Sequence, residues 1–377
     1  EMSEILSTFD NQEHKTGVAG SAGVEPVAGY HGPLSDSIGE FVTAQMLEKK
    51  NYGGAGLCAA IAMAESRVPQ VVNFACVVGL DDEARQIIDY AEDTYPINVY
   101  PQITDSAHTE QTWVILTGDG ERQGFRLSNG GGKLARDYFD PNHDKLRDRV
   151  LTPSEVMIAT SLEPTTILDT AKNYKMARRG QPSMFVWTLN TKAAQAIGEE
   201  RPHIVSGIEQ GIVDIICMSE SEANKAGVGE NDWNPVFNSI KTGLITRGAK
   251  GCSVIDNITD PGQPYIYDLP GFIVDPINTN GAGETAHAAF IATIQMFRQY
   301  YGLWTRENMS TILQVAGYAA NLAGSTKVSQ GASLQFTTDL PYTVAVDLVG
   351  RGERDPDRII EAMSNAYQPN TYFSQKR

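Results

Sequence analysis

Basic residues are scarce in this chain of 377 residues. Lysine and arginine together number 30 against 46 aspartates and glutamates, so the formal net charge is −16. A surface this negative repels a phosphate backbone, which argues against nucleic acid as the main partner. A local site for an anion such as ATP stays open, because a few basic side chains and a helix N-terminus are enough to hold one.

Long hydrophobic runs and metal-binding spacings are also lacking. Hydrophobic residues make up 41% of the chain, and no stretch is long and apolar enough to cross a bilayer, so we expect no membrane partner. Four cysteines, Cys58, Cys76, Cys217 and Cys252, lie in apolar runs without a C-x-x-C pair. This pattern favours buried thiols in a reducing, cytoplasmic compartment. The histidines show no ligand spacing, which argues against a structural metal.

Short apolar strands alternate with helices from residue 155 onward. The apolar runs at 156–161, 184–189 and 212–218 have the length of buried strands, and 164–179 has the pattern of a connecting helix. Such alternation is typical of a mostly parallel sheet covered by helices on both faces. The chain is therefore predicted to be an α/β protein.

The first third of the chain has a different pattern. An amphipathic stretch predicts a helix over 34–50, and apolar segments on both sides of the turn at 118–121 predict a β-hairpin. A second hairpin is predicted later, from 244–246 and 252–255. We interpret the early hairpin-rich part as a small β lid added to the main sheet.

The most informative segment is a glycine-rich turn directly before a helix. Gly281, Ala282 and Gly283 precede Glu284, and an apolar helix continues to about residue 299. Backbone N–H groups converge at such a turn, where the helix dipole adds positive potential for a phosphoryl group. A carboxylate in the first helical turn would lie beside that group as a base. The simpler alternative is a structural turn in which Glu284 only complements the dipole.

A family resemblance rests on this turn. The sequence NTNGAGE at 278–284 resembles the [DN]-T-[NT]-G-A-G-D signature of the ribokinase-like (PfkB) sugar and nucleoside kinases. Other segments are similar to motifs of that family in the same order, namely YGGAGLCAAIAMAE (52–65), VVGLDDEARQ (77–86), WTLNTK (187–192), CMSESEA (217–223), LITRGAKG (244–251) and AGYAANLAGSTKVSQGAS (316–333).

The resemblance implies a fold and an activity. The fold would be a three-layer ribokinase-like domain over 2–377, with a β lid from parts of roughly 10–50 and 95–130. The activity would be transfer of the γ-phosphoryl of ATP, with Mg²⁺, to a hydroxyl of a nucleoside or sugar. Family members are monomers or dimers joined through the lid, and the sequence leaves a homodimer open.

The resemblance also implies roles for individual residues. Glu284 corresponds to the base, and the amides of Gly281, Ala282 and Gly283 to the anion hole. Glu222 corresponds to the acid that organises Mg²⁺. The nucleotide side would comprise Thr246, Gly248, Lys192, Ser219, Asn321 and Gly324. The substrate side would comprise Gly53, Gly54, Cys58 and Asn280.

Four departures from the family pattern leave two hypotheses open. Glu284 replaces an aspartate, and Cys58 and Ser219 replace asparagines. The early sugar-binding aspartate, which in the family comes with a first strand that ends G-x-x-x-x-D, has no clean counterpart, Asp10 being the nearest. The longer side chain moves the carboxylate by roughly 1–1.5 Å, which can change a rate by about 10²-fold. The chain is either an active kinase, with T-N-G-A-G favouring adenosine or inosine–guanosine kinase-like members, or an impaired kinase-fold binding or scaffold protein.

Overall fold

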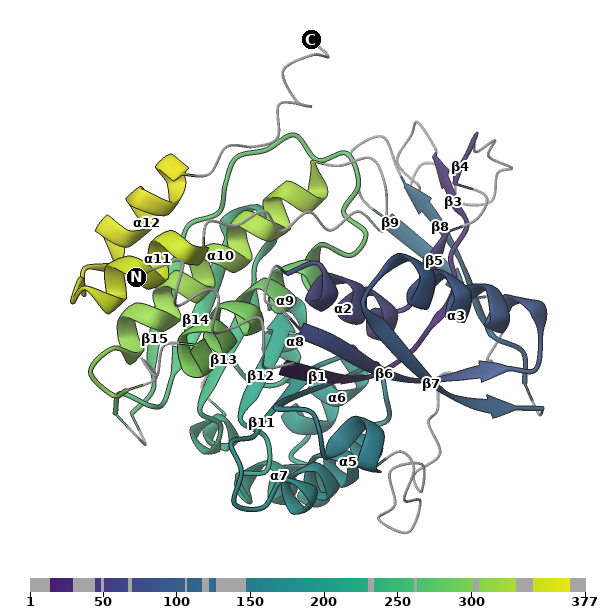
Figure 1. The fold of residues 1–377 in the computed structure, drawn as a ribbon, viewed down its shortest axis with the longest axis horizontal. Helices are drawn as coiled ribbons and strands as arrows, with labels where there is room; N and C mark the ends of the chain where they lie inside the picture. Colours follow the sequence, from purple (N-terminus) through teal and green to yellow (C-terminus); the bar gives the residue numbers. More distant parts are fainter. Residues whose placement is uncertain are drawn as a thin grey trace.

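The described part of the chain forms a large sheet with helices on both faces and a smaller sheet at one side (Figure 1). The computed structural model describes residues 14–29, 45–48, 51–66, 70–105, 107–116, 122–126, 147–229, 234–260, 263–300, 305–329 and 342–366.

The main sheet is parallel over most of its width. Its strand order is β15-β14-β13-β12-β11-β10-β1-β6-β7, and only β14 and β15 run antiparallel to their neighbours. In chain order its strands are β1 (His14–Ala19), β6 (Gln70–Gly79), β7 (Ile97–Thr104), β10 (Val156–Thr160), β11 (Met184–Thr188), β12 (Ile215–Ser219), β13 (Thr242–Thr246), β14 (Cys252–Asp256) and β15 (Tyr265–Leu269).

Alternating side chains of the strands feed two separate cores. In β11, Met184 and Val186 join one core, whereas Phe185 and Trp187 join the other. Both sides of this central strand are therefore covered, as expected for a parallel sheet with helices on both faces.

The helices divide between these two faces. One face carries α2 (Ala55–Ala64), α3 (Asp82–Thr94), α9 (Ala282–Gln295), α10 (Met309–Val328), α11 (Tyr342–Gly350) and α12 (Pro356–Ala366). The other carries α5 (Pro164–Ala177), α6 (Thr191–Gly198), α7 (Pro202–Glu209) and α8 (Glu220–Lys225). Short helical turns are η2 (Arg147–Leu151), η3 (Pro235–Ser239), η4 (Gly248–Lys250) and η5 (Met296–Tyr300).

The smaller sheet branches from the main one after β1. Its path is β4-β3-β8-β2-β5, with β9 beside β8. The strands are β2 (Gly23–Val24), β3 (Val27–Gly29), β4 (Gln45–Glu48), β5 (Tyr52–Gly53), β8 (Glu110–Leu116) and β9 (Arg122–Arg126). Two segments inside the ranges assigned to the lid, β1 and β7, instead pair with β6 in the main sheet.

The predicted α/β class and most predicted elements are confirmed. The strands at 156–160 and 184–188, the helix at 164–177 and the hairpin of β13 and β14 lie where the sequence placed them. The helix predicted over 34–50 is wrong at its end, because 45–48 form β4, paired with β3. Pairing with the neighbouring strand outweighs the local amphipathic pattern and makes this segment a strand.

The four cysteines are buried, and none forms a disulfide, in agreement with the sequence. Burial raises the pKa of Cys252, beside the β13–β14 hairpin, to about 12. Its thiol is therefore a protonated core group at neutral pH. Among the described helices, none combines the length and apolar character of a membrane span.

Candidate active site

The turn before α9 is built by local hydrogen bonds. The Asn278 side chain accepts a bond of 2.9 Å from the backbone N–H of Asn280. Gly281 then adopts a left-handed conformation with φ 77° as the residue before α9, which glycine takes without strain. The Thr285 hydroxyl donates to the Gly281 carbonyl at 2.7 Å and closes the first helical turn. The glycine and its polar neighbours thus fix where α9 begins.

The backbone N–H groups of this turn differ in their hydrogen bonding. The N–H of Ala282 donates to the Thr279 carbonyl over a long 3.3 Å, whereas the N–H groups of Gly281 and Gly283 have no acceptor within the described residues. A side-chain carbon added to Gly283 would meet nothing within 4 Å. Gly283 therefore presents an open N–H at a helix N-terminus, where an anion is favoured.

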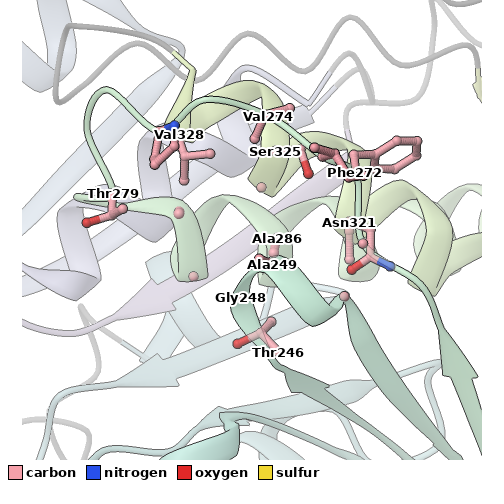
Figure 2. Close-up of a pocket in the computed structure, with 18 residues that line it drawn as sticks. Thr246, Gly248, Ala249, Phe272, Val274, Thr279, Ala286, Asn321, Ser325 and Val328 are labelled. Atoms are coloured by element: carbon pink, nitrogen blue, oxygen red, sulfur yellow. The ribbon is translucent and has the colours of Figure 1, made fainter. Parts of the chain in front are cut away.

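A cleft of about 400 Å³ lies in front of this turn. Figure 2 shows it between the η4 loop, the start of α9, α10 and the 271–279 segment. Its lining includes the predicted residues Thr246, Gly248, Ala282, Gly283, Asn321 and Gly324. Six of the sequence-predicted residues, drawn from three distant segments, thus come together at one cavity.

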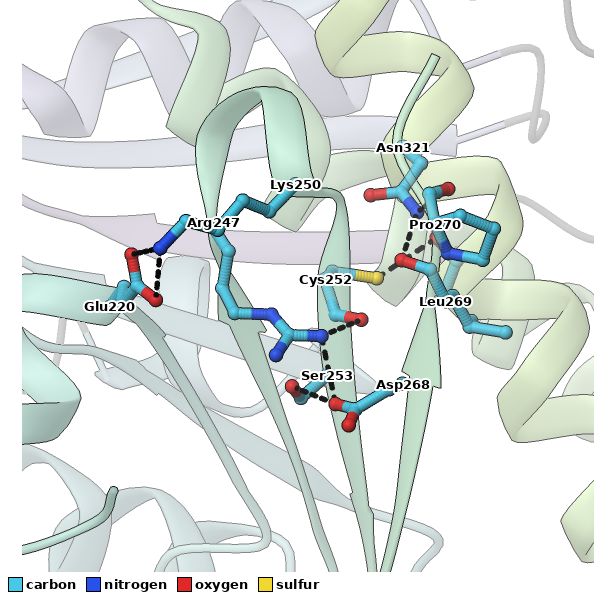
Figure 3. A network of polar contacts seen from close by, with 10 residues as sticks. Glu220, Arg247, Lys250, Cys252, Ser253, Asp268, Leu269, Pro270 and Asn321 are labelled. Carbon is cyan, nitrogen blue, oxygen red and sulfur yellow. Dashed lines mark hydrogen bonds and ion pairs between the residues drawn. The ribbon is translucent and has the colours of Figure 1, made fainter. Parts of the chain in front are cut away.

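Polar contacts hold the wall of the cleft in place. The Asn321 amide donates to the carbonyls of Leu269 and Pro270, at 3.3 and 3.1 Å. Behind the hairpin loop, Arg247 pairs with Asp268 at 2.8 Å, and Ser253 donates to the same carboxylate (Figure 3). The loop and the segment after β15 are therefore preorganised around the cavity.

Helix α8, which carries Glu220 and Glu222 in its first turn, lies next to this loop. Lys250 of η4 pairs with Glu220 at 3.2 Å (Figure 3). Ser219 and Glu222 form a capping box: the Ser219 N–H and hydroxyl donate to the Glu222 carboxylate at 2.8 and 2.9 Å, and the Glu222 N–H donates back at 3.3 Å. The serine that replaces the family asparagine thus orients the neighbouring acid.

Two acids, Glu222 and Glu284, act on each other electrostatically. Burial raises the pKa of Glu222, the hydrogen bonds from Ser219 lower it, and the charge of Glu284 raises it further. Glu284 itself is half-buried in the first turn of α9, with no hydrogen-bond partner among the described residues. Carboxylate oxygens near a phosphate site are ligands that suit Mg²⁺, which also keeps water and substrate phosphate oxygens. The described residues contain no enclosing group of three acidic, histidine or cysteine ligands.

The predicted substrate side contains an acid that the sequence analysis missed. The Glu25 carboxylate accepts from the Gly54 N–H at 2.9 Å and from the Asn280 side chain at 3.3 Å. It lies against Gly53 so closely that a side-chain carbon there would be 2.1 Å from its carboxyl carbon. Cys58 is buried one turn further along, on α2. Gly53, Gly54 and Asn280 therefore meet around Glu25.

A sequence signal for Glu25 existed. The family pattern G-x-x-x-x-D ends in aspartate, whereas Gly20 to Glu25 follow β1 as G-x-x-x-x-E. Allowing the same Asp-to-Glu exchange as at position 284 would have found it. The alternative candidate, Asp10, lies outside the described residues.

Lys192 lies elsewhere. Its ammonium pairs with Glu163 at 3.2 Å, and three quarters of its side chain is exposed. It is not among the residues that line the cleft. Lys192 lies in α6, directly after β11, and its ion pair therefore links α6 to the residue that precedes α5.

Comparison with known proteins gives one consistent picture. Residues 39–334 match the family described as pfkB family carbohydrate kinase. An uncharacterized sugar kinase of Pyrococcus horikoshii is 28% identical over 193 residues. That match covers 50% of this chain and spans only 56% of the relative.

Solved structures share the fold, among them two ribokinases. A ribokinase from Giardia lamblia superposes with a TM-score of 0.66 at 18% identity, covering 85% of this chain and 96% of its own. An Arabidopsis thaliana ribokinase complexed with ribose and ATP has a TM-score of 0.61 at 15% identity, covering 93% and 99%.

Proposed function

Because the chain belongs to the pfkB family of carbohydrate kinases, we propose that it transfers the γ-phosphoryl of ATP to a hydroxyl of a nucleoside or sugar. One observation carries the proposal: a single turn faces two sites. Ala282 and Gly283 line the large cleft, whereas Asn280, two residues before Ala282, contacts Glu25, and neither of these two residues lines the cleft. Glu284 follows directly, where a base between donor and acceptor is required.

The donor would occupy the cleft lined by Thr246, Gly248, Asn321 and Gly324. The relative from Arabidopsis was solved with ATP, which supports ATP as the donor. The open N–H of Gly283 would hold the transferring phosphoryl group, with Gly281 and Ala282 beside it. Amides fixed before the reaction stabilise developing charge without reorganisation. Glu222 would hold Mg²⁺ through water, and the ion would neutralise charge on the phosphates.

The acceptor would lie between Glu25 and Glu284. Glu25 would accept hydrogen bonds from two hydroxyls of the acceptor, while the backbone at Gly53 and Gly54 allows a close approach. Glu284 would take the proton of the attacking hydroxyl as its oxygen bonds to the γ-phosphorus. The bond from that phosphorus to the β–γ bridging oxygen breaks, and ADP leaves.

Release of ADP in the presence of ATP, Mg²⁺ and a panel of sugars and nucleosides tests this function. We expect turnover that depends on the acceptor, favours one class of compound and falls by at least about 10³-fold in Glu284→Gln. The variant should keep the binding of a non-hydrolysable ATP analogue, because the cleft is unchanged.

The kinase-fold binding protein remains the competing function. It is favoured if the panel gives no ADP although nucleotide and a sugar or nucleoside both stabilise the fold in thermal melts. Activity gained only after Glu25→Asp and Glu284→Asp are combined would support the same conclusion.

A further inference from the structure

A second small cavity lies directly behind Glu284. It is lined by Ala59 of α2, Ile158 and Thr160 of β10, Thr188 of β11, and Glu284, His287, Ala288 and Ile291 of α9. The cavity is separate from the nucleotide cleft, since the two share no lining residue. It therefore lies between α9 and the ends of β10 and β11, under the proposed base.

His287 in this cavity is buried without a partner. Its side chain is 8% exposed, and neither ring nitrogen makes a hydrogen bond. A buried imidazole left unpaired costs free energy, and such groups in native proteins are usually satisfied by water or serve a function. His287 follows Glu284 by three residues, so the two side chains lie on the same face of the helix.

Other polar residues line the same cavity. They are Glu284, Thr160 and Thr188, which bring one carboxylate and two hydroxyls to it. Thr160 lies two residues after Ile158 on β10, so both side chains face the side of the sheet that α9 covers. The cavity measures about 10 Å³, close to the smallest space that holds one water molecule, which needs two to four polar partners.

We propose that His287 is a positioning residue for Glu284: it holds one water that bridges the imidazole, a threonine hydroxyl and the catalytic carboxylate. The need for such a support follows from the glutamate. Its additional rotatable bond gives the carboxylate more freedom than an aspartate has, and a fixed base must lose that freedom. The water-held imidazole supplies the constraint from behind, leaving the other carboxylate oxygen to the acceptor hydroxyl.

The imidazole is neutral in this role. Burial lowers the pKa of His287 to about 4, so at neutral pH one ring nitrogen donates and the other accepts. Apart from Glu284 and His287, the residues lining the cavity from α2, β10 and β11 do not titrate between pH 4 and 10. Outside it, Glu222 of α8 is close enough for the charge of Glu284 to raise the pKa of Glu222.

The positioning role depends on the phosphotransfer proposed above, and variants separate the two. His287→Phe keeps a planar ring and removes both nitrogens, whereas His287→Gln keeps a donor and an acceptor. We expect kcat to fall roughly 10- to 100-fold in His287→Phe, with the KM for ATP unchanged, and to recover in part in His287→Gln. The acid limb of the kcat/KM profile should move to higher pH in His287→Phe, because the carboxylate loses a donor that favours its charged form.

Thr160→Val provides a second variant that removes a hydroxyl without changing shape. It should lower kcat in the same direction by a smaller factor. Ile294→Val, in the buried part of the same helix, controls for loosening of α9 and should leave the pH profile in place.

Nitrogen NMR of the histidine side chains gives a readout without turnover. The ring nitrogen shifts of His287, assigned with the His287→Gln variant, should change in Glu284→Gln. The positioning role would be overturned if the wild type is active and two results hold. These are an unchanged kcat and acid limb in His287→Phe and unchanged His287 ring shifts in Glu284→Gln. Absence of any wild-type turnover would instead overturn the proposed phosphotransfer.

Discussion

Two glutamates on either side of the proposed acceptor site each exceed the family aspartate by one methylene. Glu25 contacts Gly54 and Asn280, and Glu284 lies three residues after Gly281. A longer acid on both sides narrows the space between them, so the exchanges are best understood as a matched pair. One alone would displace a carboxylate by roughly 1 Å, which is costly for a base.

We therefore expect Glu25→Asp and Glu284→Asp to be non-additive. Each single change should lower kcat/KM about 10-fold or more, because one carboxylate withdraws while the other keeps its reach. Combining them should cost less than the sum of the two, as for residues that share one ligand. Steady-state kinetics on the best acceptor measures this, and strictly additive losses would show that the two acids act independently.

The buried imidazole of His287 also predicts a pH effect on stability. In the folded chain its pKa is about 4, against about 6.5 when unfolded. As pH falls from 6.5 to 4, the unfolded chain binds a proton that the folded chain does not, so the free energy of unfolding decreases. The loss amounts to about 3 kcal/mol and levels off below pH 4.

Urea titrations at a series of pH values test this sign. His287→Phe should lose stability less steeply than the wild type between pH 6.5 and 4. Parallel curves for the two proteins would contradict the buried, neutral state of the ring.

At the scale of the element, the first turn of α9 contains a glycine that the proposed function explains. Gly283 lies in the first turn of the helix, and a methyl group there would enter open space on the cleft side. Glycine inside a helix costs roughly 0.5–1 kcal/mol relative to alanine. Stability is thus given up at the point where the proposed phosphoryl group needs the backbone.

Gly283→Ala should consequently separate stability from activity. We expect the free energy of unfolding to rise by about 0.5–1 kcal/mol, while kcat/KM for ATP falls because the methyl group occupies the phosphoryl position. Alanine at Gly180, which also meets nothing within 4 Å but has φ 80°, is the matched control and should destabilise without affecting ATP. Unchanged kinetics in Gly283→Ala would remove this amide from the anion hole.

Elements far from the site were predictable to different degrees. The strands β10, β11 and β12 were predictable because each is a buried apolar run followed by a helix, a pattern set by burial on both faces. The strand β4 was missed because its identity depends on pairing with β3, which no local pattern encodes. Glu25 was missed because the family motif G-x-x-x-x-D has aspartate where this chain has glutamate. That His287 has no hydrogen-bond partner becomes apparent only from the packing of α9 against β10 and β11.

At the scale of the whole molecule, the two ends of the sheet's strands differ, one serving the proposed function and the other the fold. Ser219 is the last residue of β12 and Glu222 follows it, whereas Asp214 precedes the start of the strand. Asp214 is almost fully buried, pairs with Lys175 of α5 and with Lys241 at 2.7 Å, and accepts from the Phe185 N–H at 2.7 Å. This acid ties three neighbouring strands and a helix together, away from the proposed chemistry.

Asp214→Ala should therefore weaken the fold and leave catalysis intact. Removing one partner of a buried, hydrogen-bonded ion pair costs about 3 kcal/mol, which chemical denaturation measures. Below the unfolding transition, the KM for ATP should match that of the wild type. A changed KM would mean that the two ends of the sheet's strands are coupled.

The carboxylates on either side of the proposed acceptor position also bear on the end of the catalytic cycle. Glu25 follows β2, and Glu284 lies in the first turn of α9. A neutral polyol enters between these two negative charges at little cost, but it departs carrying a phosphate ester with nearly two charges of the same sign. We expect electrostatic expulsion of the ester to hasten each turnover and to keep metabolites that are already phosphorylated from competing for entry.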